Sequence, residues 1–110
     1  MPLAPGLYRL AWRTLLGEGA STVRLDDGEF RSLDGPRFEG RLHAAGDAFT
    51  ARLTVADPGP VAYAYGRDHL DIDLSGRAYG PRALLVGRAP QAPGLEIEAE
   101  LTRLIRGHNT

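Results

Sequence analysis

Residues 49–55 read FTARLTV, with apolar side chains at every second position and polar or charged ones in the positions between. In a β-strand successive side chains point to opposite faces, so this segment has one apolar face and one polar face. The same alternation occurs in YRLAWRT (8–14), LDIDLS (70–75) and LEIEAEL (95–101). A chain built from such segments buries its apolar faces together, in a β-sandwich or a closed barrel.

Turn signals divide the chain into eight expected strands. Asp27-Gly28 is the strongest hairpin signal, because a two-residue type I′ turn needs a positive φ at both positions. Ser75-Gly76-Arg77 also predicts a turn, and Gly17 and Gly19 predict a turn or a bulge. The two prolines of residues 57–60 exclude a central strand there. The expected strands cover residues 7–14, 20–26, 29–33, 37–43, 48–56, 69–75, 82–88 and 95–102.

The number and order of these strands predict the architecture. A chain of 110 residues favours one domain, residues 1–110. Short turns favour neighbours that pair in order, and closure into a barrel removes exposed strand edges. We therefore expect an all-β, single-domain, eight-stranded antiparallel up-and-down meander barrel. Glutamates are poor strand residues, so the last strand also permits a helical turn after it.

Composition excludes several functional classes. The chain contains no cysteine, and so has no disulfide, thiolate metal site or cysteine nucleophile. A formal net charge of −1 provides no broad basic surface for nucleic acid or for an anionic membrane. The N-terminal residues lack the basic and apolar regions of a signal peptide, and no apolar run approaches ~18 residues. We expect a cytoplasmic protein.

The polar residues form no recognisable catalytic or metal-binding set. His43, His69 and His108 lie at strand ends or in the tail, without the convergent spacing of zinc ligands. Asp71 and Asp73 lie near His69, but alternation places them on a polar strand face. No serine has the Gly-x-Ser-x-Gly setting of a nucleophile. We expect no enzyme activity, no metal and no cofactor.

Apolar side chains on the alternating faces are expected to point into the barrel. An eight-stranded barrel is either filled by its side chains or holds one small ligand. We expect a filled core, and the alternative is a pocket for a lipid or another small hydrophobic molecule, with Tyr63 and Tyr65 as lid residues. The interior residues, which would line such a pocket, are Tyr8, Leu10, Trp12, Phe38, Phe49, Leu53, Leu70 and Ile72.

Four segments resemble the GrlR-like family, small bacterial proteins named for a negative regulator of type III secretion. They are GLYRLAWRTLLGEG (6–19), VRLDDGEF (23–30), RFEGRLHAAGDAFTARLTV (37–55) and GRAPQAPGLEIEAELTRL (87–104). The resemblance implies a lipocalin-like barrel that forms a homodimer and binds a protein partner. In the founding regulator that partner is a helix-turn-helix activator, bound through acidic residues in the turn between the fourth and fifth strands. Here the corresponding turn holds one acid, Asp47.

A second acidic feature lies on the last strand. Glu96, Glu98 and Glu100 share one face, and this arrangement favours a cationic partner. The outward arginines Arg37, Arg41 and Arg52 are candidates for cross-strand ion pairs. The leading hypothesis is a non-enzymatic regulator that binds a protein partner such as a transcriptional regulator, and the alternative is a calycin-type carrier. The expected partner-binding residues are Asp47, Glu96, Glu98 and Glu100.

Overall fold

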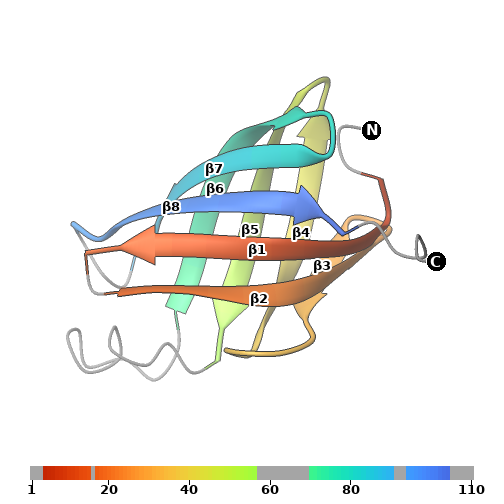
Figure 1. Cartoon of the computed structure of the whole chain (residues 1–110). Helices are drawn as coiled ribbons and strands as arrows, with labels where there is room; N and C mark the ends of the chain where they lie inside the picture. Colours follow the sequence, from red (N-terminus) through yellow and green to blue (C-terminus); the bar gives the residue numbers. More distant parts are fainter. Residues whose placement is uncertain (1–3, 16, 57–69, 91–93, 105–110) are drawn as a thin grey trace.

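The fold is a closed antiparallel β-barrel (Figure 1). The structure is a computed structural model, and it describes residues 4–15, 17–56, 70–90 and 94–104. The strands are β1 (Gly6–Thr14), β2 (Gly17–Asp26), β3 (Glu29–Ser32), β4 (Phe38–Ala45), β5 (Ala48–Val55), β6 (Leu70–Tyr79), β7 (Arg82–Arg88) and β8 (Glu96–Arg103). Each strand pairs antiparallel with the next, and β8 pairs with β1, so the expected eight-stranded up-and-down barrel is confirmed.

Two walls can be distinguished in Figure 1. Strands β7, β8, β1 and β2 form the wall nearest the viewer, which we call the front wall, and β4, β5 and β6 lie behind it. On each strand the alternation sorts side chains between the interior and the surface. Strand β5 shows this clearly, because every second residue from Phe49 to Val55 is buried and the residues between them are exposed.

One end of the barrel, which we call the hairpin end, is closed by two-residue turns. Asp27-Gly28 joins β2 to β3 with φ values of 52° and 78°, as the expected type I′ turn requires. Gly46-Asp47 joins β4 to β5, and Gly80-Pro81 joins β6 to β7. The opposite end, the loop end, carries the connections between the other strands, which are longer except for the one from Thr14 of β1 to Gly17 of β2.

The expected turn at residues 75–77 is wrong. Strand β6 continues through Gly76 to Tyr79, and Gly76 pairs with residues of both neighbouring strands. A Cβ atom on Gly76 would overlap the carbonyl oxygen of Leu84, so glycine is needed there because the backbone of β7 comes very close. The glycine marks a close approach between strands and not a reversal of the chain.

The glycines before residue 20 have a similar explanation. We expected a turn or bulge at Gly17 and Gly19, but β2 begins at Gly17 and includes both. A Cβ atom on Gly19 would lie 2.6 Å from Cζ2 of Trp12, so the missing side chain makes room for the indole. The other strand ends differ from expectation by a few residues. The expected helical turn after the last strand falls largely beyond Leu104, where the described residues end.

Candidate functional site

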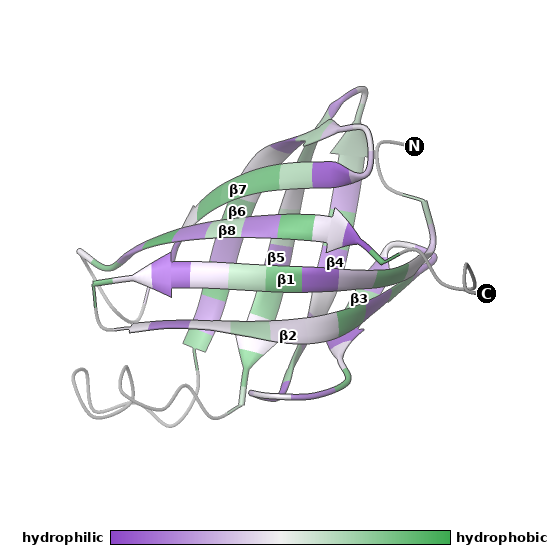
Figure 2. Cartoon of the chain, viewed as in Figure 1, coloured by the Kyte–Doolittle hydropathy of each residue, from purple (hydrophilic) through white to green (hydrophobic). Residues whose placement is uncertain are grey.

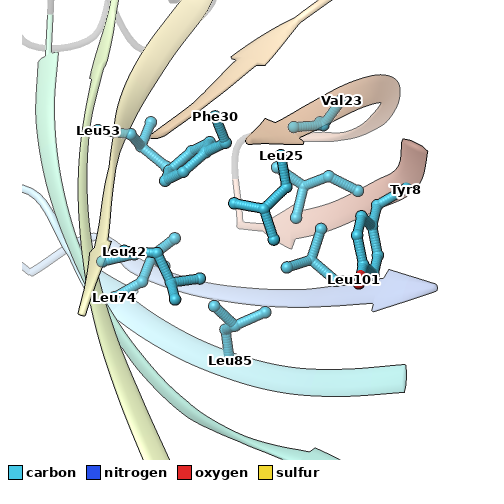
Figure 3. Close-up of a pocket in the computed structure, with 11 residues that line it drawn as sticks. Tyr8, Val23, Leu25, Phe30, Leu42, Leu53, Leu74, Leu85 and Leu101 are labelled. Carbon is cyan, nitrogen blue, oxygen red and sulfur yellow. The ribbon is translucent and has the colours of Figure 1, made fainter. Parts of the chain in front are cut away.

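In the part of the barrel that the described residues enclose, side chains fill the interior. Between them remains a cavity of about 20 Å³ among residues that include Leu25, Leu42 and Leu85 (Figure 3). This is about the space of one water molecule. Six expected interior residues, Tyr8, Leu10, Phe38, Phe49, Leu53 and Leu70, are buried, and Trp12 and Ile72 are half-buried against this core. Tyr63 and Tyr65, the expected lid residues, lie outside the described residues.

Two glutamates of β8 are held by arginines of the neighbouring strands. Arg13 of β1 donates to Glu98, with 3.3 Å between Nη2 and Oε1, and Arg82 of β7 donates to Glu100. Glu96 lies opposite Arg88 in the ladder between β7 and β8. The acidic row therefore lies on the outer surface as expected, but arginines accompany it.

Asp47, the other residue expected to bind a partner, lies apart from the glutamates of β8. Asp47 lies in the turn between β4 and β5, whereas β8 lies in the front wall, so the structure does not bring Asp47 and the glutamates together (Figure 1). The expected cross-strand ion pairing is confirmed for Arg41 and Arg52, whereas Arg37 forms no ion pair with the described residues. Arg41 pairs with Glu29 at 3.1 Å, and Arg52 pairs with Asp73 at 3.3 Å.

An exposed apolar strip on β7 was missed by the sequence reasoning. Leu84 and Val86 point outward and are 53% and 59% exposed. Much of β7 is apolar in Figure 2, because inward and outward residues are both hydrophobic over residues 83–86. A continuous apolar run of this kind is the available signal, since a strand with only one buried face normally alternates.

These two side chains border a shallow hollow of about 750 Å³ on the front wall, which we call the front hollow. The small residues Ala11 and Ala20, which face each other across β1 and β2, also line it. Its charged lining consists of Arg9, Arg13, Glu18, Glu98 and Glu100. The arrangement combines apolar area with charges of both signs, as protein-binding surfaces do.

Acid–base or metal chemistry has little support among the described residues. None of them belongs to a group of three or more His, Cys, Asp or Glu side chains suited to hold a metal ion. Asp73 is paired with Arg52, and Asp71 accepts a 2.7 Å hydrogen bond from the hydroxyl of Thr54. His69 and His108 lie outside the described residues. Nor does any helix in the described ranges have the length and apolar character to cross a membrane.

One carboxylate at the loop end has a shifted pKa. The backbone N–H of Thr22 donates to Oδ1 of Asp34 at 2.7 Å, and this hydrogen bond lowers the pKa of the Asp34 carboxyl. The Thr22 carbonyl accepts from the N–H of Leu33 at 2.8 Å. Together these bonds continue the edge of β2 where β3 has ended, and they tie the connection between β3 and β4 to the barrel.

No protein-family model matches this chain, and no curated protein is significantly similar to it. The resemblance to the GrlR-like family therefore stays a prediction from the sequence motifs. Three features of the molecule bear on its function: an interior filled by the described side chains, an arginine-flanked acidic row and an exposed apolar strip.

Proposed function

We propose that the protein is a non-enzymatic regulator that binds a protein partner, such as a transcriptional regulator, through the front hollow. The observation that carries this proposal is the outward exposure of Leu84 and Val86 beside that hollow. Exposed apolar side chains gathered in a concave patch with a polar rim are typical of protein interaction sites. Their burial against a partner would remove apolar surface from water and so stabilise the complex.

The charges around the strip suit a partner that carries both apolar and cationic side chains. Glu98 and its partner Arg13 have side chains that are 65% and 70% exposed, respectively. An ion pair this exposed contributes only about 0–1 kcal/mol, so a cation of the partner can replace Arg13 at little cost. Charges at the rim would then set the orientation and the association rate of the partner.

The filled interior also supports an outward-facing site. A calycin-type carrier needs space for its ligand, and the described residues leave about 20 Å³. Carriage of a small hydrophobic molecule or lipid remains the alternative, and the cavity lends it no support.

We further propose, on the family resemblance, that the protein is a cytoplasmic homodimer. The ladder between β1 and β8 leaves neither strand with an open edge there, so a dimer contact would use outer faces. Light scattering after size-exclusion chromatography tests this proposal. A monomer mass at micromolar concentration would contradict it.

The partner proposal is tested by comparing three forms of the full chain as bait. We expect wild-type protein and a Thr50→Arg control to capture the same proteins from native cytosol, since Thr50 is exposed on β5, behind the front wall. The double variant Leu84→Arg/Val86→Arg should lose them, because two arginines replace the apolar strip. Capture of the same proteins by all three forms would place the contact elsewhere, and no specific capture by wild type would contradict the proposal.

A further inference from the structure

Arg103 occupies an unusual position in the barrel. It lies directly opposite Tyr8 in the ladder between β1 and β8, so the two side chains share a face of the sheet. Tyr8 is buried in the core, and the guanidinium carbon of Arg103 lies 5.8 Å from the centre of its ring. Among the inward positions of the described strands, Arg103 is the one charged residue.

No described carboxylate neutralises this cation. The ion pairs formed within the described ranges all involve other arginines. Arg103 Nη1 donates to the Ala4 carbonyl oxygen and to the Tyr8 hydroxyl, both at 3.4 Å, which is long for a hydrogen bond. Its Nε and Nη2 donors bond to nothing in the described part of the chain.

The surroundings hold the guanidinium in place. The Tyr8 hydroxyl donates to the Ala4 carbonyl oxygen at 2.5 Å, which fixes the group that Arg103 Nη1 contacts. A Cβ atom on Gly6 would lie 3.2 Å from Arg103 Nη2, so glycine leaves the guanidinium room at this point. Arg103 is therefore oriented by neutral groups, and among the described residues nothing bonds to the Nε–Nη2 edge of its guanidinium.

That edge has the chemistry of a carboxylate receptor. The Nε–H and Nη2–H groups of an arginine are parallel and match the two oxygens of a carboxylate. Tyr8 and Leu101, which flank Arg103 on β1 and β8, also line the apolar cavity (Figure 3). That cavity measures about 20 Å³, the space of about one water molecule, so it admits no alkyl chain and the edge can recognise only the carboxylate group.

We propose that Arg103 and Tyr8 form a carboxylate-binding site at the hairpin end of the barrel, and that its ligand is a small-molecule carboxylate held through its two oxygens. The guanidinium edge binds both carboxylate oxygens, Tyr8 positions the guanidinium, and the rest of the ligand stays outside the barrel interior. This site is independent of the front hollow, so either proposal can fail without the other.

Titration of the ¹⁵N-labelled full chain with sodium butyrate, followed by NMR, tests the site. We expect saturable shifts of the Arg103 Nε–H signal and the Gly6 amide, with a dissociation constant on the order of 1 mM. Butyramide, which has nearly the same shape without the charge, and sodium chloride at equal ionic strength should not produce them. Octanoate should bind no more tightly than butyrate, because the cavity has no space for its chain, and clearly tighter binding would overturn the assignment of recognition to the carboxylate group alone.

Variants then separate binding from folding. Arg103→Gln should weaken butyrate binding at least tenfold, Arg103→Lys should weaken it less, and Tyr8→Phe should weaken it a few-fold. Arg24→Gln, which removes an exposed arginine of β2, should bind like wild type. A dispersed NMR spectrum checks that each variant is folded. If Arg103→Gln does not fold, the binding of Arg103→Lys tests the role of Arg103 instead. The proposal is overturned if wild type shows no saturable shift, or if the folded Arg103 variants bind like wild type.

Discussion

The two ends of the barrel reach their shapes by different means. At the hairpin end, three two-residue turns each place a glycine at positive φ, from 63° to 78°. At the loop end, the connection between β3 and β4 is held by side chains. Asp34 accepts from the backbone of β2, and Ser32 accepts from the N–H of Phe38 at 2.9 Å. Backbone conformation thus fixes the hairpin end, whereas the loop end adds particular side-chain contacts to a glycine at positive φ, Gly35 at 69°.

The largest loss of stability is expected when one member of an aromatic pair toward the loop end is replaced. Trp12 and Phe38 pack edge to face, with ring centres 6.2 Å apart and planes at 90°. Trp12→Ala should lower the free energy of unfolding by about 3 kcal/mol, because a large half-buried side chain leaves a cavity. Urea unfolding followed by circular dichroism measures the loss. Leu15→Ala, at a side chain that is 95% exposed, should change little, and an equal loss in both variants would refute this account.

A smaller loss of stability is expected from a substitution at the hairpin end. Gly28 has a φ of 78°, and a Cβ atom there would lie 3.3 Å from the Leu42 carbonyl oxygen. Gly28→Val should cost roughly 2 kcal/mol, because a β-branched residue is strained at positive φ. The same urea experiment applies. Asp27→Asn is the matched control, since asparagine tolerates this conformation and should leave stability nearly unchanged. If Gly28→Val unfolded at the same urea midpoint as wild type, backbone conformation would not fix this end.

Two serines at the loop end should respond in opposite directions. Ser21 is 2% exposed, and its hydroxyl has no hydrogen-bond partner among the residues that the structure describes. Ser21→Ala should therefore raise stability by about 1 kcal/mol, because it removes an unsatisfied buried polar group. Ser32→Ala should lower stability by about 1 kcal/mol, because it leaves the Phe38 N–H without its acceptor. Thermal unfolding of both variants tests the pair, and shifts of the same sign would contradict it.

The smallest expected effect is the contribution of Asp34 to the dependence of stability on pH. The Thr22 hydrogen bond lowers the pKa of Asp34 in the folded state relative to the unfolded chain. Asp34 therefore contributes stability above its unfolded pKa, and this contribution disappears as the pH falls through the lowered folded pKa. Asp34→Asn cannot titrate. The stability difference between wild type and this variant should shrink as the pH is lowered from neutral to strongly acidic values, and a constant difference in urea titrations would contradict this.

Alternation predicted the fold because each strand of a small barrel has one buried face and one wet face. Strand β5 is the clearest example, and Asp27-Gly28 shows that local turn chemistry also operates as expected. Gly76 could not be interpreted correctly from its neighbours. Its role depends on the approach of the β7 backbone, which is known only once the strands are paired.

The candidate sites were less predictable for the same reason. The glutamates of β8 were recognised as an outward row, but their pairing with Arg13 and Arg82 depends on the register between strands. The outward exposure of Leu84 was hidden in a run that is typical of a fully buried strand. Nothing in the sequence distinguishes Arg103 from the other arginines, and only the ladder places it over the ring of Tyr8.

Closure of the barrel has a consequence for the chain as it is synthesised. Tyr8 and Arg103, which pair when the ring closes, are separated by 95 positions in sequence. At a synthesis rate of about 5–20 residues per second, β1 waits roughly 5–20 s before β8 emerges from the ribosome. Until then β1 and β7 each present an open edge to which another nascent chain can add. The finished molecule hides these edges, so the period of greatest aggregation risk falls during translation.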